Sequence, residues 1–449
     1  MKNLLILSCF LFVLNMAAQD HFSGINTSKR IGILNAGINP AELSNLNSKY
    51  EINVFSASIN ASNNKVGFED LINSNNIEDL IFTGSDPVNM RIDSEIYGPG
   101  FAMKVNKWAF AFTTKAYAKL SVIDVDPQLG QAINNGTLNT FLTSTSLNND
   151  YNQRINGTTY GEVGFSIARN LYNNEKHKFN TGITLKLLFP GSYANFGADK
   201  FKGEIRTFGG DAFLNNADAK VNFAYSGSLA NDFTNSNDYL QSLFGPLNGV
   251  AADIGFNYQL KDSTGYKLNA GVSIRNIGGM TFKDNNNQST NYTLRIESTF
   301  DKPNGLNLNQ FQNVTNFKEV ETILLNEGYL TKLEGNKNFK VSLPTVFTAY
   351  ADIKVVSKFF VAVYTQQKLK NDKQNDQITT QNVFSVTPRI YFKNYELFSS
   401  WAANEISGTT GGFGFRIYGF YLGSSSIVTA LINNSKQADV FIGYRVGLR

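Results

Sequence analysis

The sequence has very few of the residues that metal and cofactor sites require. It contains one cysteine, Cys9, and two histidines, His21 and His177, in 449 residues. Cys9 lies in the apolar run at the N-terminus, so the rest of the chain can form no disulfide and no cysteine metal site. Neither histidine has a second histidine or a cysteine at ligand spacing, and both are predicted to be surface residues. The sequence therefore predicts no metal and no cofactor.

Long hydrophobic runs are missing as well. Beyond the N-terminus there is no stretch of about eighteen apolar residues, which excludes membrane-spanning helices. Residues 1–19 instead have the pattern of a secretory signal peptide, with Lys2, an apolar run from Leu4 to Met16 and small residues before an expected cleavage site at Asp20. A helical anchor is the alternative, but the run is too short to cross a bilayer. An exported β protein remains, either periplasmic or secreted, or an outer-membrane barrel.

Charge and proline are also sparse. Charged residues make up 17% of the chain and the formal net charge is +4, with no cluster of lysine and arginine. A nucleic-acid partner is therefore not expected. Proline occurs nine times, whereas aromatic residues reach 13% and glycine occurs 37 times. This composition is typical of many alternating strands joined by polar turns.

The clearest pattern is a β-hairpin over residues 253–276, in which apolar and polar residues alternate on both sides of a polar turn at 261–265. Each strand has about nine to eleven residues, enough to cross a bilayer at a tilt. In a transmembrane barrel the apolar face contacts lipid and the polar face lines a wet lumen. The predicted lumen-facing residues are Asp253, Asn257, Gln259 and Arg275. A contact between Asp253 and Arg275 is expected to brace the lumen rather than to bind a substrate.

Similar hairpins recur along the chain, and short turns alternate with long polar loops as in outer-membrane barrels. We predict an all-β fold, a transmembrane antiparallel β-barrel of about 14 strands. The barrel is assigned to residues 49–449, with weaker strands at Gly203–Phe208 and Val221–Tyr225. Helical insertions are expected near 66–83, 128–143 and 313–334, where apolar residues follow a helical period. Residues 20–48 form a separate N-terminal segment.

No catalytic motif is present. We find no nucleophile elbow, phosphate-binding loop, zinc-protease motif or calcium loop in the sequence. The scattered pairs of carboxylates are expected to be solvated loop residues. The protein is therefore predicted not to be an enzyme, and a hydrolase built from lumen residues stays an alternative without a candidate nucleophile.

Several segments together resemble a known family. They are Asn39-Pro40-Ala41, the Gly98-Pro99 turn, the hairpin at Ala251–Gly278 and the strands at Arg416–Ser425 and Ala438–Gly447. In these the chain resembles a Bacteroidota outer-membrane barrel family catalogued only as a domain of unknown function. It is also distantly similar to fatty-acid-transporter-like barrels and to accessory barrels of the type 9 secretion system. The former resemblance implies that residues 20–48 plug the lumen, with Asn39, Pro40 and Ala41 as the plug motif.

Two functions follow from these patterns. The first is passive transport or binding of a small solute, hydrophobic solutes included, by a barrel in the cell outer membrane. The alternative is a non-enzymatic structural or accessory subunit that joins a secretion or surface complex through loops such as 313–334. The expected partners are outer-membrane lipid, the barrel assembly machinery and, for the alternative, secretion-system or surface-complex proteins.

Overall fold

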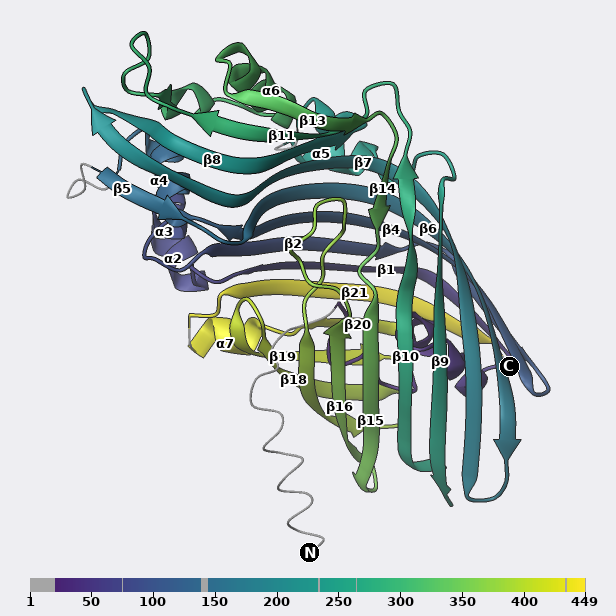
Figure 1. Cartoon of the computed structure of the whole chain (residues 1–449). Helices are drawn as coiled ribbons and strands as arrows, with labels where there is room; N and C mark the ends of the chain where they lie inside the picture. The colour runs from purple at the N-terminus through teal and green to yellow at the C-terminus, as the bar shows by residue number, and fades with distance from the viewer. Residues whose placement is uncertain are drawn as a thin grey trace, which may run out of the picture.

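A single antiparallel sheet closes on itself as a ring of 14 strands (Figure 1). The computed structural model describes residues 21–74, 76–138, 144–232, 235–263, 265–432 and 434–448, so the predicted signal peptide at 1–19 lies outside them. The ring closes where β1 pairs with β21, from Tyr50 opposite Leu448 to Ser62 opposite Gln437. Closure satisfies the backbone of both strands, as a wall in contact with lipid requires.

The predicted strand number is therefore confirmed. β2 and β3 share one place in the ring, because β3 pairs with the start of β1 and β2 with its remainder. The strands of the ring are β1 (Tyr50–Asn63), β2 (Val88–Tyr97), β3 (Gly100–Val105), β4 (Trp108–Val125), β6 (Asn152–Asn173), β7 (His177–Phe208), β9 (Gly249–Asp262), β10 (Gly265–Phe282), β15 (Val346–Val356), β16 (Phe359–Lys368), β17 (Val383–Tyr391), β18 (Tyr395–Asn404), β19 (Gly408–Ile417), β20 (Phe420–Ser424) and β21 (Gln437–Leu448).

Side chains alternate across the wall with inverted polarity. On β4 the rings of Trp108, Phe110 and Phe112 are 36 to 40% exposed on the outer surface, whereas Ala109 and Ala111 between them are buried. The same alternation on the other strands points large apolar side chains outward and polar ones inward. This is the arrangement that a β-barrel adopts in lipid.

The two ends of the barrel differ in their connections. Turns of two or three residues join β3 to β4, β6 to β7, β9 to β10, β15 to β16, β17 to β18 and β19 to β20. These turns lie at one end, together with the start of β1 and the end of β21. The long connections at 64–87, 126–151, 283–345 and 369–382 lie at the other end. We call these the short-turn end and the long-loop end.

The sheet continues beyond the ring at the long-loop end (Figure 1). β7 is 32 residues long, and its second half pairs with β5 and β8, which bring in further strands. The two weaker strands of the prediction belong to this extension, one as the end of β7 and one within β8. The additional strands are β5 (Ser144–Asn148), β8 (Asp211–Ser226), β11 (Gln288–Ile296), β12 (Leu306–Asn307), β13 (Leu330–Asn336) and β14 (Phe339–Ser342).

The helices lie in the long connections and in the lumen, and none in the described residues is long and apolar enough to cross a membrane. Within 313–334 only the first part is helical: Gly328, with a φ of 78°, ends the helix, and β13 follows by pairing with β11. The helices are α2 (Phe68–Asn73), α3 (Ile77–Ile81), α4 (Pro127–Asn135), α5 (Ser236–Gln241), α6 (Phe317–Asn326), α7 (Ile427–Ile432) and the 3₁₀ helices η1 (Gly32–Gly37), η2 (Pro40–Asn45), η3 (Ser228–Ala230) and η4 (Leu308–Phe311).

Because the outer surface of the ring faces lipid, an arginine should affect stability differently at two exposed positions of β7. Ile183 is 50% exposed in the middle of the ring, and Phe208 is 65% exposed at the end of β7, beyond it. Ile183→Arg should cost about 2–4 kcal/mol of folding free energy in lipid, because it places a charge near the bilayer centre. Phe208→Arg is the matched control and should cost less than about 1 kcal/mol. Denaturant titration of both variants folded into vesicles measures this, and equal stabilities would contradict the assigned membrane position.

Candidate functional site

Residues 21–48 lie inside the ring and fill its half nearest the short turns (Figure 1). We call them the plug segment. They form η1 and η2, both of which are buried almost throughout. η2 contacts the inner faces of β4, β6, β7 and β9, so it is attached to one side of the wall. The lumen is therefore obstructed by the chain's own N-terminal segment.

The Asn-Pro-Ala motif forms the turn that starts η2. The side-chain oxygen of Asn39 accepts a hydrogen bond from the amide of Ala41 at 3.0 Å, and Pro40 occupies the first helical position, where no amide is needed. The side-chain amide of Asn39 donates to the carbonyl of Phe256 at 2.8 Å and to the hydroxyl of Tyr350 at 3.2 Å. One residue thus caps the helix and attaches it to two strands.

Three glycines on neighbouring strands make room for this turn. A side chain at Gly182 of β7 would overlap the backbone of Pro40, and one at Gly255 of β9 would overlap the side chain of Asn39. A side chain at Gly271 of β10 would overlap the hydroxyl of Tyr350. We call these three positions the glycine socket, because the turn can approach the wall this closely only where side chains are missing.

Glu42 anchors the plug segment by hydrogen bonds from neutral groups. Its carboxylate is 3% exposed and accepts from the hydroxyl of Tyr350 at 2.5 Å and from the amides of Asn257, Asn269 and Asn45 at 2.7 to 2.9 Å. These donors compensate the carboxylate for the water it has lost.

The predicted lumen residues of β9 all point to the interior. Asn257 binds Glu42 of the plug segment, as described, and Gln259 donates to the side-chain oxygen of Asn269 at 2.9 Å. Asp253 is 2% exposed and forms an ion pair with Lys186 of β7 at 2.9 Å. Asn257 and Gln259 thus share Asn269 as a partner near the plug segment, whereas Asp253 contacts β7 beside the chamber.

Arg275, the predicted residue on β10, reaches the plug segment. Its guanidinium donates to the carbonyl of Gly37 at 2.7 Å and to the hydroxyl of Thr348 at 3.2 Å. The sequence predicted a contact between Asp253 and Arg275, whereas Asp253 pairs with Lys186 of β7 and Arg275 contacts the plug segment and β15. The two sides of the predicted hairpin hold different parts of the lumen.

A belt of buried ion pairs faces the other side of the plug segment. Asp352 and Arg389 are both fully buried at 2.6 Å from each other, and Arg389 also donates to the hydroxyl of Thr27. Glu51 pairs with a neighbouring arginine and accepts from the amide of Ile33 at 3.0 Å. The belt consists of Asp352, Arg389, Glu396, Arg416, Glu51 and Arg445, with nitrogen to oxygen distances of 2.6 to 3.9 Å.

A charged chamber lies in the middle of the lumen, beyond the plug segment. It has an empty volume of about 720 Å³ and a wall of alternating charges. Lys119 pairs with Asp93 at 2.8 Å, and Lys115 lies 3.7 Å from Glu95 and 3.8 Å from Glu162. Because both signs alternate around it, the chamber carries no strong excess of either charge.

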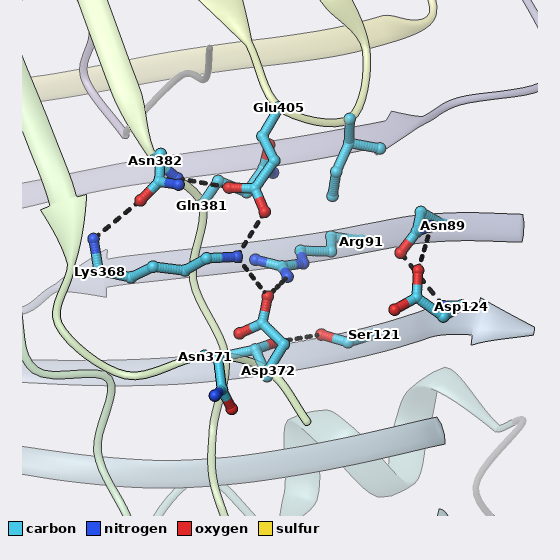
Figure 2. A network of polar contacts seen from close by, with 12 residues as sticks. Asn89, Arg91, Ser121, Asp124, Lys368, Asn371, Asp372, Gln381, Asn382 and Glu405 are labelled. Carbon is cyan, nitrogen blue, oxygen red and sulfur yellow. Dashed lines mark hydrogen bonds and ion pairs between the residues drawn. The ribbon is translucent and has the colours of Figure 1, made fainter. Parts of the chain in front are cut away.

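The connection 369–382 folds into the lumen from the long-loop end. Figure 2 shows how its residue Asp372 is held: Arg91 of β2 lies 2.8 Å from the carboxylate and Lys368 lies 2.6 Å from it. Lys368 also pairs with Glu405. Burial alone would raise the pKa of Asp372, but the charges of Arg91 and Lys368 hold that pKa below its ordinary value. We call residues 369–382 the inner loop.

Arg154 of β6 binds the backbone of the inner loop. The guanidinium is fully buried and donates to the carbonyls of Asp372 and Gln377, both at 3.0 Å. Near the chamber the hydroxyls of Ser121 and Thr379 lie 3.2 Å apart. The plug segment and the inner loop thus obstruct the lumen from opposite ends.

An apolar pocket of about 240 Å³ adjoins Arg154 at the long-loop end. Its lining comes from the residue after α3, from α4 and η4, and from the long-loop ends of β4, β6 and β7, and Arg154 forms part of its boundary. The apolar residues that line it are Phe82, Val125, Leu129, Ile133, Ile155, Phe196, Ala198, Phe201 and Phe311. We call it the outer pocket.

Sequence reasoning missed the inner loop, the glycine socket and the outer pocket. The inner loop reads as a solvated polar connection, NDKQNDQITT, and no pattern indicates that it turns inward. The socket glycines gave a usable signal, because Gly182, Gly255 and Gly271 interrupt three otherwise regular strands.

The histidines were predicted at the surface, whereas His21 lies inside the lumen, 2.9 Å from the hydroxyl of Ser58. In the described residues, no cluster of three or more possible ligands could hold a metal.

The socket predicts that one added side chain will displace the plug segment. Gly182→Val should force the Asn-Pro-Ala turn off the wall, because the overlap is with the backbone of Pro40 and cannot be relieved by a rotamer change. Thr181→Val, on the outward face of the same strand, is the matched control. We expect higher single-channel conductance and faster proteolysis within residues 21–48 for the first variant alone. A Gly182→Val barrel with unchanged conductance and protection would show that the socket does not hold the plug segment.

The inner loop predicts a pH dependence. Burial raises the pKa of Asp376 to about 6, although Arg154 partly opposes this. Since the docked loop favours the protonated acid, docking should weaken as the pH rises from about 4 to 6 and stay weak above, by about 1 kcal/mol between pH 5 and pH 7. Asp376→Asn should remove this change, and asparagine tolerates the positive φ of 47° at this position. Hydrogen exchange of the loop amides measures docking, and an equal pH dependence in the variant would refute the assignment.

Comparison with known proteins gave one family and several distant structures. A search of curated proteins found no match. The toluene transporter TbuX of Ralstonia pickettii is similar at 11% identity with a TM-score of 0.43, over 97% of this chain and 100% of that chain. The toluene transporter TodX of Pseudomonas putida has 9% identity and a TM-score of 0.43, over 96% and 98%. The translocator domain of the autotransporter NalP from Neisseria meningitidis has 10% identity and a TM-score of 0.31, over 89% and 90%.

The family model covers most of the chain. It matches residues 40–425, from the proline of the plug motif to the end of β20, and so includes the glycine socket, the chamber and the inner loop. The chain belongs to the family of unknown function DUF5723.

Proposed function

We propose that this protein is an outer-membrane channel for small hydrophobic solutes, and that the structure is its closed state. The barrel wall suits lipid on its outer surface, and the long loops would face the exterior while the short turns face the periplasm. Two segments of the chain itself, the plug segment and the inner loop, obstruct the lumen. In this proposal the barrel assembly machinery inserts the protein, and the surrounding outer-membrane lipid is its solvent.

The outer pocket is the observation that carries the choice of solute. Its walls are mostly phenylalanine, leucine and isoleucine, and it lies at the long-loop end, which faces the exterior in this proposal. Transfer of apolar surface from water into such a site is favourable by about 25 cal/mol per Å². A pocket of this size and lining suits one small apolar molecule rather than a sugar or a peptide.

Arg154 links the outer pocket to the inner loop. The arginine borders the pocket and donates two hydrogen bonds to the carbonyls of the loop. The guanidinium and the pocket lie on opposite faces of β6, because Gln153 and Ile155, the neighbours of Arg154, line the pocket. A solute that displaces this part of β6 would weaken both contacts and favour release of the loop. The solute would then reach the charged chamber. The plug segment lies between this chamber and the periplasm.

Passage beyond the chamber requires movement of the plug segment. Its anchor at Glu42 consists of hydrogen bonds from neutral amides and a hydroxyl, which water can replace. On the other side, the charged residues of the belt form ion pairs with each other within the wall. Their charges are therefore neutralised without the plug segment. Displacement of the plug would therefore leave a wall that water can hydrate.

The sheet extension favours a second function, that of an accessory subunit. β13 is paired with β11 on one side, and its residues from Thr331 onward are exposed, with Leu333 58% exposed. Such an edge can add a strand from a partner protein. Purification from outer membranes in mild detergent distinguishes the two: a stoichiometric protein partner supports the accessory role, and a barrel recovered alone supports the channel.

The channel proposal predicts separable effects of the pocket and the plug segment. Leu129→Asp should weaken binding of the apolar probe N-phenyl-1-naphthylamine at least tenfold, because it places a charge in the outer pocket. Gln131→Asp on the same helix, outside the pocket, is the control. Deletion of residues 22–46 should leave probe binding unchanged and raise conductance and solute uptake in proteoliposomes. Unchanged binding in the first variant would refute the pocket as the solute site, and unchanged uptake in the deletion would refute the plug.

A further inference from the structure

The short-turn end of the barrel is lined by cations. Two clefts open there on either side of the plug segment, and together they contain eight lysine or arginine side chains. Among the described residues that line them there is no carboxylate. The cations are Lys29, Arg30, Lys354, Lys358 and Lys393 in the larger cleft and Lys104, Lys107 and Lys178 in the smaller one.

Aromatic rings form the floor of the larger cleft. Phe360 stacks on Tyr391 with ring centroids 4.4 Å apart and packs on Tyr266 at 5.4 Å, and all three rings are nearly buried. The guanidinium of Arg30 lies 4.3 Å from the centre of the Tyr391 ring, and the ammonium of Lys29 lies 5.4 Å from that of Tyr266. These contacts hold two cations of the plug segment above a rigid base.

The cations of this cleft come from separate parts of the chain, and Lys354 among them is paired with Asp262 at 2.6 Å. Lys29 and Arg30 belong to the plug segment, whereas Lys358 and Lys393 lie exposed in the short turns after β15 and β17. Arg30 also donates to the carbonyl of Phe392 at 2.8 Å, which is one direct link between plug and wall. Like charges on the two sides repel each other, and a multivalent anion between them would change this repulsion into attraction.

We propose that this cleft binds a phosphate group, and that the bound phosphate holds the plug segment against the barrel wall. Guanidinium and ammonium groups are the side chains that recognise phosphate oxygens, and a cleft of about 580 Å³ has room for a phosphorylated headgroup. The binding site stands on the geometry of the cleft, and only its effect on closure rests on the proposed channel function.

The surroundings indicate a lipid headgroup as the source of the phosphate. Val355, Val356, Phe392 and Tyr395 are 46 to 59% exposed beside the cationic turns. A phospholipid of the periplasmic leaflet could place its acyl chains along this apolar surface while its phosphate enters the cleft. A soluble phosphorylated molecule would use the same cations without the apolar contacts.

The experiment compares the intact protein in nanodiscs of phosphatidylcholine with and without phosphatidylglycerol, and adds tripolyphosphate as a soluble probe. Hydrogen exchange of residues 27–33 reports attachment of the plug segment. We expect phosphatidylglycerol to slow exchange at least fivefold, and this effect to disappear in the double variant Lys358→Asn and Lys393→Gln. Asparagine suits the positive φ of 72° at residue 358. The control variant Lys318→Gln and Lys332→Gln, at the long-loop end, should respond as the original protein does.

Each outcome supports or refutes part of the proposal. Protection by tripolyphosphate but not by phosphatidylglycerol, lost in the cleft variant, supports the phosphate site and refutes the lipid source. Equal exchange under all conditions, or equal protection of the cleft variant, refutes the site. Exchange is measured without any solute, so a failure of the channel proposal would show in uptake and not in this experiment.

Discussion

The pairing of β1 with β21 is the contact on which the rest of the structure depends. Without it the wall would have two open edges, and it could not separate the lipid outside the ring from the water inside it. Because β1 begins directly after the plug segment, the seam also fixes where that segment enters the lumen. Glu51 on β1 pairs with Arg445 on β21 and accepts a hydrogen bond from the backbone of Ile33. One carboxylate therefore connects the closure of the sheet with the obstruction of its interior.

The interior shows two ways of burying polar groups. The wall neutralises its own charges, as in the ion pair of Asp352 with Arg389, so these charges are balanced whether or not another segment covers them. The plug segment instead uses Asn39 and Glu42, whose partners are amides, carbonyls and a hydroxyl. Attachment by exchangeable hydrogen bonds onto an already neutral wall fixes the position of the obstruction and is compatible with the movement that the proposed channel requires.

The sequence predicted the barrel because one physical rule, alternation across a lipid-facing wall, acts at every strand. The hairpin at 253–276 and the strand number followed from it. This rule applies only within the membrane. The sequence pattern therefore did not show that β7 continues as a single strand as far as Phe208. Helical period alone also extended the helix near 313–334 too far, since pairing with β11 takes over after Gly328. The inner loop depends on Arg91 and Arg154, residues more than two hundred positions away in the chain, and no local pattern encodes such contacts.

The length of β7 has a mechanical consequence. A single strand, with bulges at Gly191 and near Lys200, carries Gly182 under the plug motif, Lys186 beside the chamber and Phe196 and Phe201 in the wall of the outer pocket. Hydrogen bonds to β6 along nearly its whole ring portion make it stiff lengthwise. A small tilt of β7 at the outer pocket would therefore displace Gly182 under the plug motif as well, without any change in the pairing of the sheet.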